Sequence, residues 1–139
     1  DVDEVFKTCT HIAIHCNLTE ETHHLVNSHT LSLMPGIGAD GIPCGNHLVS
    51  CARGGVVNED DALLALEEGI LNSCALDVFE NEPQTHHPIL THPNFHGTPH
   101  IGAATHEAQH RIGIEMANLL IRFFDGDIPN SVVNRDVLN

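Results

Sequence analysis

Residues 47–69 read HLVSCARGGVVNEDDALLALEEG, and this segment indicates the class of fold. The apolar run 47–52 predicts a β-strand, and the glycines that follow Arg53 predict a tight turn at its end. Asn58, followed by acidic residues, predicts the start of a helix that ends at Gly69. A strand, a turn and a helix in this order are the repeating unit of α/β proteins.

The same alternation continues on both sides of that segment. Short apolar or β-branched runs predict further strands, and stretches with helical spacing or capping residues predict the helices between them. The predicted strands are 11–15, 47–52, 74–79 and 95–98, and the predicted helices are 1–8, a stretch opened by Thr19 as N-cap, 28–34, the segment after Asn58 and the segment from Thr105 to Gly126. This order indicates an α/β fold with a partial Rossmann-like, doubly wound parallel sheet and flanking helices.

Three polar positions directly follow predicted strands. They are Arg53, the segment 77–82 and His100. Ligands of parallel α/β sheets bind at the carboxyl ends of the strands. We therefore expect these three positions to lie on one rim of the sheet.

The helix after Thr105 carries apolar residues three and four positions apart, a spacing that predicts a core-facing stripe. The stripe consists of Ile112, Met116, Leu119, Leu120 and Phe123. A chain of 139 residues with 41% hydrophobic residues has the size and composition of one compact unit.

The formal net charge of −14 predicts that the chain binds neither nucleic acid nor acidic membrane surfaces, because both would repel it. The first residues do not resemble a signal peptide, and no window has the length of a membrane span. These features favour a cytoplasmic protein.

The cysteine and histidine patterns predict no metal site. The 5 cysteines form no C-x-x-C pair, so we expect free, mostly buried thiols rather than disulfides or a zinc site. His106 and His110 stand four residues apart on the last helix, but no H-E-x-x-H motif surrounds them. The two histidines are interpreted as solvated helix residues.

Residues 36–41, GIGADG, match the glycine pattern of dinucleotide-binding loops, G-x-G-x-x-G. That pattern binds a pyrophosphate only between a strand and the first turn of a helix. Here no strand precedes it, and Pro43 and Gly45 follow where the helix should run. We interpret 37–47 as an irregular surface loop.

Three longer phrases carry a family resemblance. They are CARGGVV at 51–57, ALDVFENEP at 75–83 and TPHIGAAT at 98–105. In this order and spacing they resemble the D-isomer-specific 2-hydroxyacid dehydrogenases of the phosphoglycerate dehydrogenase kind. The likeness covers nearly the whole chain, which corresponds to the C-terminal portion of the family's NAD-binding domain (1–139), with 37–47 as an irregular insertion.

The resemblance implies catalytic roles for three residues. Arg53 would bind the substrate carboxylate and polarise its 2-oxo group. His100 would be the acid/base that exchanges a proton with the 2-hydroxyl, and Glu82 would bond to its ring and favour the imidazolium. Taken one at a time, each has a structural interpretation: Arg53 as a solvated turn residue, Glu82 as a surface residue and His100 as a structural histidine.

The resemblance also implies NAD as cofactor, with NADP left open. Asp77 would hold the nicotinamide carboxamide, although an aspartate there is alternatively a loop cap. The residues that would lie against the cofactor are Cys16, Asn17, Thr19, Cys51, Ala52, Arg53, Asp77, His100, Gly102 and Ala103. Asn17 stands where the family often has proline.

Two functions follow from the resemblance. The first is an NAD-dependent oxidoreductase acting on a small D-2-hydroxy acid of the phosphoglycerate, glyoxylate or hydroxypyruvate class, in a homodimer. The chain lacks the glycine fingerprint of the family, so activity of this polypeptide alone is left open. The alternative is a non-catalytic NAD-binding or protein-interaction module, because 15–19 and 23–27 resemble the C-terminal binding protein corepressors.

Overall fold

The computed structural model describes residues 1–138, which divide into two compact units. The first unit is Asp1–Ile101, and the second begins at Gly102. Length and composition alone predicted one compact unit, so the division is a finding of the structure. Each unit is described by itself below.

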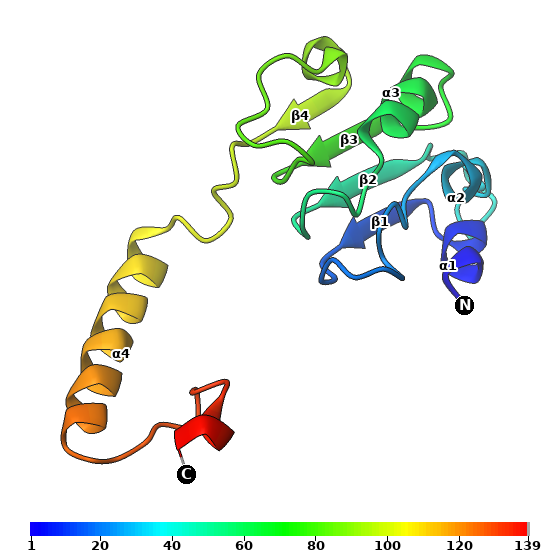
Figure 1. The fold of residues 1–139 in the computed structure, drawn as a ribbon. Helices are drawn as coiled ribbons and strands as arrows, with labels where there is room; N and C mark the ends of the chain where they lie inside the picture. The colour runs from blue at the N-terminus through cyan, green and yellow to red at the C-terminus, as the bar shows by residue number, and fades with distance from the viewer. Residues whose placement is uncertain (139) are drawn as a thin grey trace. The chain divides into compact units, whose positions relative to one another are not determined.

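The first unit contains a four-stranded parallel sheet (Figure 1). Its strands lie in chain order and are β1 (His11–Ile14), β2 (His47–Ser50), β3 (Ser73–Leu76) and β4 (Phe95–Gly97). The predicted strands are confirmed, although each is one to three residues shorter than expected at its carboxyl end. Residues such as Asp77 and Cys51 therefore belong to the loops that leave the sheet, and this places them on its rim.

Burial alternates along the strands and so defines the face that packs. In β1, Ile12 and Ile14 are buried while His11 and Ala13 are exposed. β2 and β3 repeat this period of two, which is the geometry of a pleated strand. The residues that form the centre of the core are Phe6, Val26, Leu31, Leu48, Val56, Leu71, Cys74 and Ile89.

One helical segment precedes the first strand and three connect successive strands, and successive segments contact each other. They are α1 (Val2–Thr8), α2 (Ser28–Ser32), α3 (Glu59–Glu67) and the 3₁₀ turn η1 (Pro88–Thr91). Asn58 caps α3 as predicted, because its side chain accepts a hydrogen bond from the Asp61 N–H. Gly69 follows the helix with φ +73°, a left-handed conformation that suits glycine.

Three details of the first unit differ from the sequence-based expectations. Thr19 does not open a helix: 20–24 form a turn, in which the Thr22 hydroxyl donates to the Asn17 carbonyl at 2.7 Å and competes with helical hydrogen bonding. The segment 80–93, where the sequence predicts no helix, contains the 3₁₀ turn η1. Of the five free cysteines only Cys74 is buried, so the expectation of mostly buried thiols was wrong.

The second unit contains α4 (His106–Phe124) and the short 3₁₀ turn η2 (Arg135–Leu138). Thr105 caps α4 by accepting from the Ala108 N–H, and Gly126 follows it with φ +88°, as predicted. No residue of α4 is buried. The apolar stripe of α4 was predicted to face a core. The second unit contains no such core, because η2 is too short to cover the stripe.

Gly113 lies inside α4, and a methyl group added there would meet no atom within 4 Å. Alanine loses less conformational freedom than glycine when a helix forms. We expect Gly113→Ala to stabilise the helix by about 0.5–1 kcal/mol. Helix content measured by circular dichroism during thermal unfolding checks this, and a decrease in helix content would contradict it.

Candidate active site

The carboxyl ends of β2, β3 and β4 bring the predicted catalytic residues together. Arg53, Glu82 and His100 line one open cavity of about 320 Å³. The remaining lining residues are Leu18, Gly54, Phe79 and Glu80. The structure thus places on one rim the three positions that the sequence predicted to lie there.

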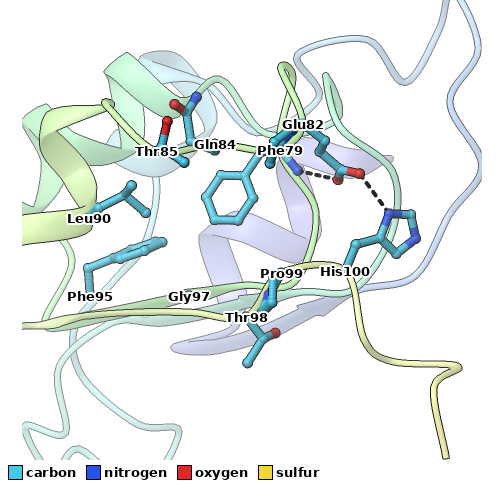
Figure 2. A pocket seen from close by; sticks show the side chains of 11 residues that line it. Phe79, Glu82, Gln84, Thr85, Leu90, Phe95, Gly97, Thr98, Pro99 and His100 are labelled. Atoms are coloured by element: carbon cyan, nitrogen blue, oxygen red, sulfur yellow. Dashed lines mark hydrogen bonds and ion pairs between the residues drawn. The ribbon is translucent and has the colours of Figure 1, made fainter.

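Glu82 and His100 are hydrogen-bonded to each other. The Glu82 Oε2 lies 2.8 Å from the His100 Nδ1, and the Glu82 Oε1 accepts from the Phe79 N–H at 3.0 Å (Figure 2). These bonds, the His100 bond first and the Phe79 bond second, lower the pKa of the Glu82 carboxyl below its usual range. Glu82 therefore remains a carboxylate at neutral pH and can orient the imidazole.

The position of His100 is fixed by the backbone as well as by Glu82. Its φ is +55°, which is uncommon for a residue with a side chain. Its N–H donates to the Asp77 carbonyl at 2.8 Å. The buried Asp77 side chain accepts at Oδ1 from the Thr98 hydroxyl at 2.5 Å and from the Ile101 N–H at 2.8 Å. Asp77 thus holds both sides of the turn that carries His100.

Arg53 is exposed on a turn that packs closely against the loop of Glu82. Its Nη1 donates to the Ala52 carbonyl at 2.6 Å. The next residue, Gly54, lies so near the Phe79 carbonyl that a Cβ atom would overlap the carbonyl oxygen. Only glycine allows this approach of two backbones. The Arg53 turn and the Phe79–Glu82 loop therefore have a fixed separation.

The residues predicted to face the cofactor have different environments. Ala52 is buried and Cys16 is half-buried against the core, whereas Asn17, Thr19 and Cys51 are exposed. All five follow the carboxyl ends of β1 and β2 and so lie on the rim of the sheet that carries the cavity. Gly102 and Ala103 belong to the second unit, and the structure does not place them relative to this rim.

The donor set on this rim fits the nicotinamide end of a dinucleotide. It offers the exposed Cys51 and a histidine beside open space, and the buried carboxylate of Asp77 holds the turn that carries this histidine. The pyrophosphate would need a glycine loop followed by a helix. Residues 36–41 do not provide it: they lie within a hairpin in which Ile37 pairs with Pro43, before the amino end of β2. The segment therefore has neither the preceding strand nor the following helix that a nucleotide loop needs.

A larger cavity, of about 580 Å³, shares Phe79, Glu82 and His100 with the first (Figure 2). Its other lining residues are Pro83, Gln84, Thr85, Leu90, Phe95, Gly97, Thr98 and Pro99. Sequence reasoning missed this cavity, because its apolar residues resemble ordinary core residues. The Glu82–His100 pair thus borders two open spaces.

Two further residues near the site form a pair that was not predicted from the sequence. The His24 Nε2 lies 2.7 Å from the Glu80 Oε1, and Glu80 lines the same cavity as Arg53. Glu80 belongs to the segment 77–82 that was expected on the rim, but no motif pairs it with His24. The signal is the fold itself, which brings positions 56 residues apart into contact.

The low pKa of Glu82 predicts a pH dependence of stability. A carboxyl whose pKa is lower in the folded state stabilises the protein above its unfolded pKa, about 4.3, and this contribution is lost as pH falls through the folded pKa. We expect Glu82→Gln to flatten the dependence of the unfolding free energy on pH below about 4.3. Urea unfolding between pH 3 and pH 7 measures the unfolding free energy of both proteins. If this free energy has the same pH dependence in the variant and in the unmodified protein, Glu82 does not contribute to it.

Comparison with known protein families gives one match to a family model. Residues 1–102 match the model described as D-isomer specific 2-hydroxyacid dehydrogenase, NAD binding domain. The matched range nearly coincides with the first structural unit. The matched unit includes Arg53, Glu82 and His100.

Two sequence relatives are enzymes by name. The chain is 37% identical over 134 residues to the D-3-phosphoglycerate dehydrogenase of Methanocaldococcus jannaschii, covering 96% of the chain and 24% of the relative. It is 37% identical over 138 residues to the glyoxylate reductase of Thermococcus onnurineus, covering 99% of the chain and 39% of the relative. The chain thus spans a quarter to two fifths of these relatives. Their names favour the dehydrogenase interpretation over the corepressor-like module.

A solved structure supports the same fold. The glyoxylate reductase of Paecilomyes thermophila superimposes with a TM-score of 0.79 at 29% identity, covering 96% of the chain and 39% of that structure. This likeness confirms the predicted Rossmann-like α/β fold. Among the residues that the structure describes, none of the helices is long and apolar enough to cross a membrane.

Proposed function

The chain belongs to the D-isomer specific 2-hydroxyacid dehydrogenase NAD-binding domain family, and from this we propose that it forms the catalytic rim of an oxidoreductase that transfers a hydride between NAD and a small 2-hydroxy acid. The observation that carries the proposal is the 2.8 Å bond between Glu82 and His100 in a cavity that Arg53 also lines. A carboxylate that orients an imidazole beside a guanidinium suits the reduction of a 2-oxo acid.

His100 is proposed as the acid that protonates the substrate. Its Nδ1 faces Glu82, so its Nε2 is the nitrogen left to reach a substrate oxygen. In the direction of reduction, the Nε2 proton passes to the 2-oxo oxygen and the product is the 2-hydroxy acid. Glu82 fixes the ring orientation throughout, because its other oxygen is held by the Phe79 N–H.

Arg53 is proposed as the group that binds the substrate carboxylate. A guanidinium presents a planar set of donors that matches a carboxylate in two parallel hydrogen bonds. Arg53 is exposed and lines the same cavity as His100, so a small 2-oxo acid can contact both. The fixed separation between the Arg53 turn and the Phe79–Glu82 loop sets the size of that substrate.

The reduced cofactor, NADH, would supply the hydride to carbon 2 of the 2-oxo acid when it is bound. The cofactor-facing roles of Asp77, Cys51 and the 16–19 segment are proposals supported by their place on the rim. The carboxylate of Asp77 would accept a hydrogen bond from the nicotinamide carboxamide. Gly102 and Ala103 are proposed as further contacts on sequence resemblance alone.

The family acts on small 2-hydroxy acids, and we propose phosphoglycerate, glyoxylate or hydroxypyruvate as the class of substrate or product. A homodimer and a cytoplasmic location are further proposals. The exposed apolar residues of α4 support an assembly that covers them. Sedimentation velocity tests the dimer, and a monomer at all concentrations would reject it.

The function is tested by assaying the purified protein with NADH or NADPH and a panel of 2-oxo acids. We expect oxidation of NADH with glyoxylate or hydroxypyruvate, and no oxidation without a 2-oxo acid. Calorimetry with NADH alone measures cofactor binding separately from turnover. The absence of both turnover and cofactor binding would refute the proposal.

Replacing Arg53 with Gln is expected to raise the KM for the 2-oxo acid by about 10-fold to 100-fold, because a hydrogen-bonded charged group contributes about 1.5–3 kcal/mol. Arg122→Gln is the matched control, since Arg122 pairs with Asp127 in the second unit. Steady-state kinetics with varied 2-oxo acid measures both variants. Equal KM values in the Arg53 variant and the unmodified protein would remove Arg53 from the site.

A further inference from the structure

His24 has an unusual backbone conformation beside the candidate site. Its φ is +50°, which makes it one of two non-glycine residues of the described chain with a positive φ; the other is His100. A left-handed conformation is uncommon for a residue with a side chain, and it persists where surrounding contacts hold it. The contacts of His24 are therefore informative.

His24 is bonded to both loops that carry the proposed catalytic groups. Its N–H donates to the Gly55 carbonyl at 2.7 Å, in the turn that follows Arg53. Its ring Nε2 pairs with the Glu80 Oε1 at 2.7 Å, in the loop that leads to Glu82. The left-handed backbone allows the N–H and the ring to reach two different segments.

Each end of this link is anchored to a helix. The His24 carbonyl accepts from the Asn27 side chain at 2.7 Å, and Asn27 caps α2. On the other side, the Glu80 N–H donates to the Glu59 side chain at 2.6 Å. Glu59 is buried in the first turn of α3. The pair thus joins two rigid supports rather than two mobile loops.

The link matters for the site because the two loops it joins face each other across the cavity. Gly54 already touches the Phe79 carbonyl, so any movement of one loop is transmitted to the other. Both members of the pair are about one-third exposed, 33% and 34% by side chain, and Glu80 lines the cavity with Arg53 and Glu82. Opening the pair would let the guanidinium and the carboxylate separate.

We propose that His24 and Glu80 form a positioning pair, which sets the separation between Arg53 and the Glu82–His100 dyad without touching the substrate. The expected effect on kinetics rests on the proposed function. The structural link between the two loops does not depend on that function. A misplacement of about 1 Å in an active site lowers turnover by about 100-fold. The pair is therefore expected to affect kcat.

The test compares four variants of the full chain, three at histidines and Glu80→Gln. His24→Asn keeps a residue that tolerates positive φ but is too short to reach Glu80. His24→Gln restores a side chain of sufficient length with a donor. His29→Asn is the matched control, because His29 pairs with Asp3 at 3.3 Å between α2 and α1, not between the catalytic loops. Each is assayed by kinetics with NADH and glyoxylate and by backbone hydrogen exchange.

We expect His24→Asn to lower kcat by about 10-fold to 100-fold and to speed hydrogen exchange in 53–56 and 79–82 only. His24→Gln should recover most of the lost kcat, and His29→Asn should change neither readout. Glu80→Gln, which keeps its length, should resemble His24→Gln. A variant that merely unfolds would exchange faster throughout the chain, and this separates instability from local release.

The outcomes distinguish the two proposals. If the unmodified protein turns over and His24→Asn matches it in both kcat and exchange, the positioning pair is refuted while the function stands. If no protein turns over or binds NADH but exchange rises only in the two loops of His24→Asn, the pair stands as a structural link and the proposed function is refuted. Uniformly faster exchange in both His24 variants would also refute the pair.

Discussion

Replacing His100 with Gln lowers kcat for reduction of a 2-oxo acid by an expected 10²-fold to 10⁴-fold, roughly the contribution of a general acid. Glutamine can still donate a hydrogen bond to Glu82, so the loop that carries it is retained, but its amide is far too weak an acid to transfer a proton to the substrate. The KM for the 2-oxo acid should change little, since Arg53 still binds the carboxylate. Steady-state oxidation of NADH measures both constants.

The control for this variant is His96→Gln. His96 is exposed on β4, the strand that precedes His100, and lines neither of the two cavities that His100 borders. It should retain the kcat of the unmodified protein. A His100 variant within about 10-fold of the unmodified protein would be too active for an acid catalyst and would reject the assignment.

Gly54→Ala is expected to destabilise the first unit by about 3 kcal/mol, the upper end of the cost of overpacking. The added Cβ would overlap the Phe79 carbonyl oxygen, a backbone atom that cannot rotate away. The two loops must then separate, so kcat should also fall by more than about 100-fold. Urea unfolding and kinetics on the same preparation measure the two effects.

Gly113→Ala is the matched control, because the same added methyl group meets no atom in α4. The comparison separates the steric effect of the methyl group from the general effect of replacing glycine. Wild-type stability and activity in the Gly54 variant would mean that the two backbones do not approach as the structure has them.

The fold was predictable where local signals were strong. The start of α3 was predictable from Asn58 and the acidic residues that follow it, and its end from the glycine after the helix. Apolar runs located the four strands. The turn after Thr19 was not predictable in this way, because its acidic residues and N-cap also suit a helix. The outcome depended on a threonine hydroxyl bonding to a carbonyl five residues earlier.

The candidate site was predictable only in part. Arg53, Glu82 and His100 each follow a strand, and parallel strands bring their carboxyl ends together. His24 and Glu80 carried no such signal, since their pairing depends on a left-handed backbone and on loops that meet only in three dimensions. For α4 a sequence signal was present but incomplete. The periodic pattern shows which face of the helix is apolar, but it does not show what covers that face.

The order of the sheet has a consequence for how the protein is made. Every strand pairs with the one that precedes it in the chain, so each new strand can add to an edge that has already emerged from the ribosome. Within this chain, the Glu82–His100 pair can form only after β4 has been made, because His100 follows β4. Pulse-labelled hydrogen exchange should find β1 and β2 amides protected before those of β4, and simultaneous protection would contradict this sequential assembly.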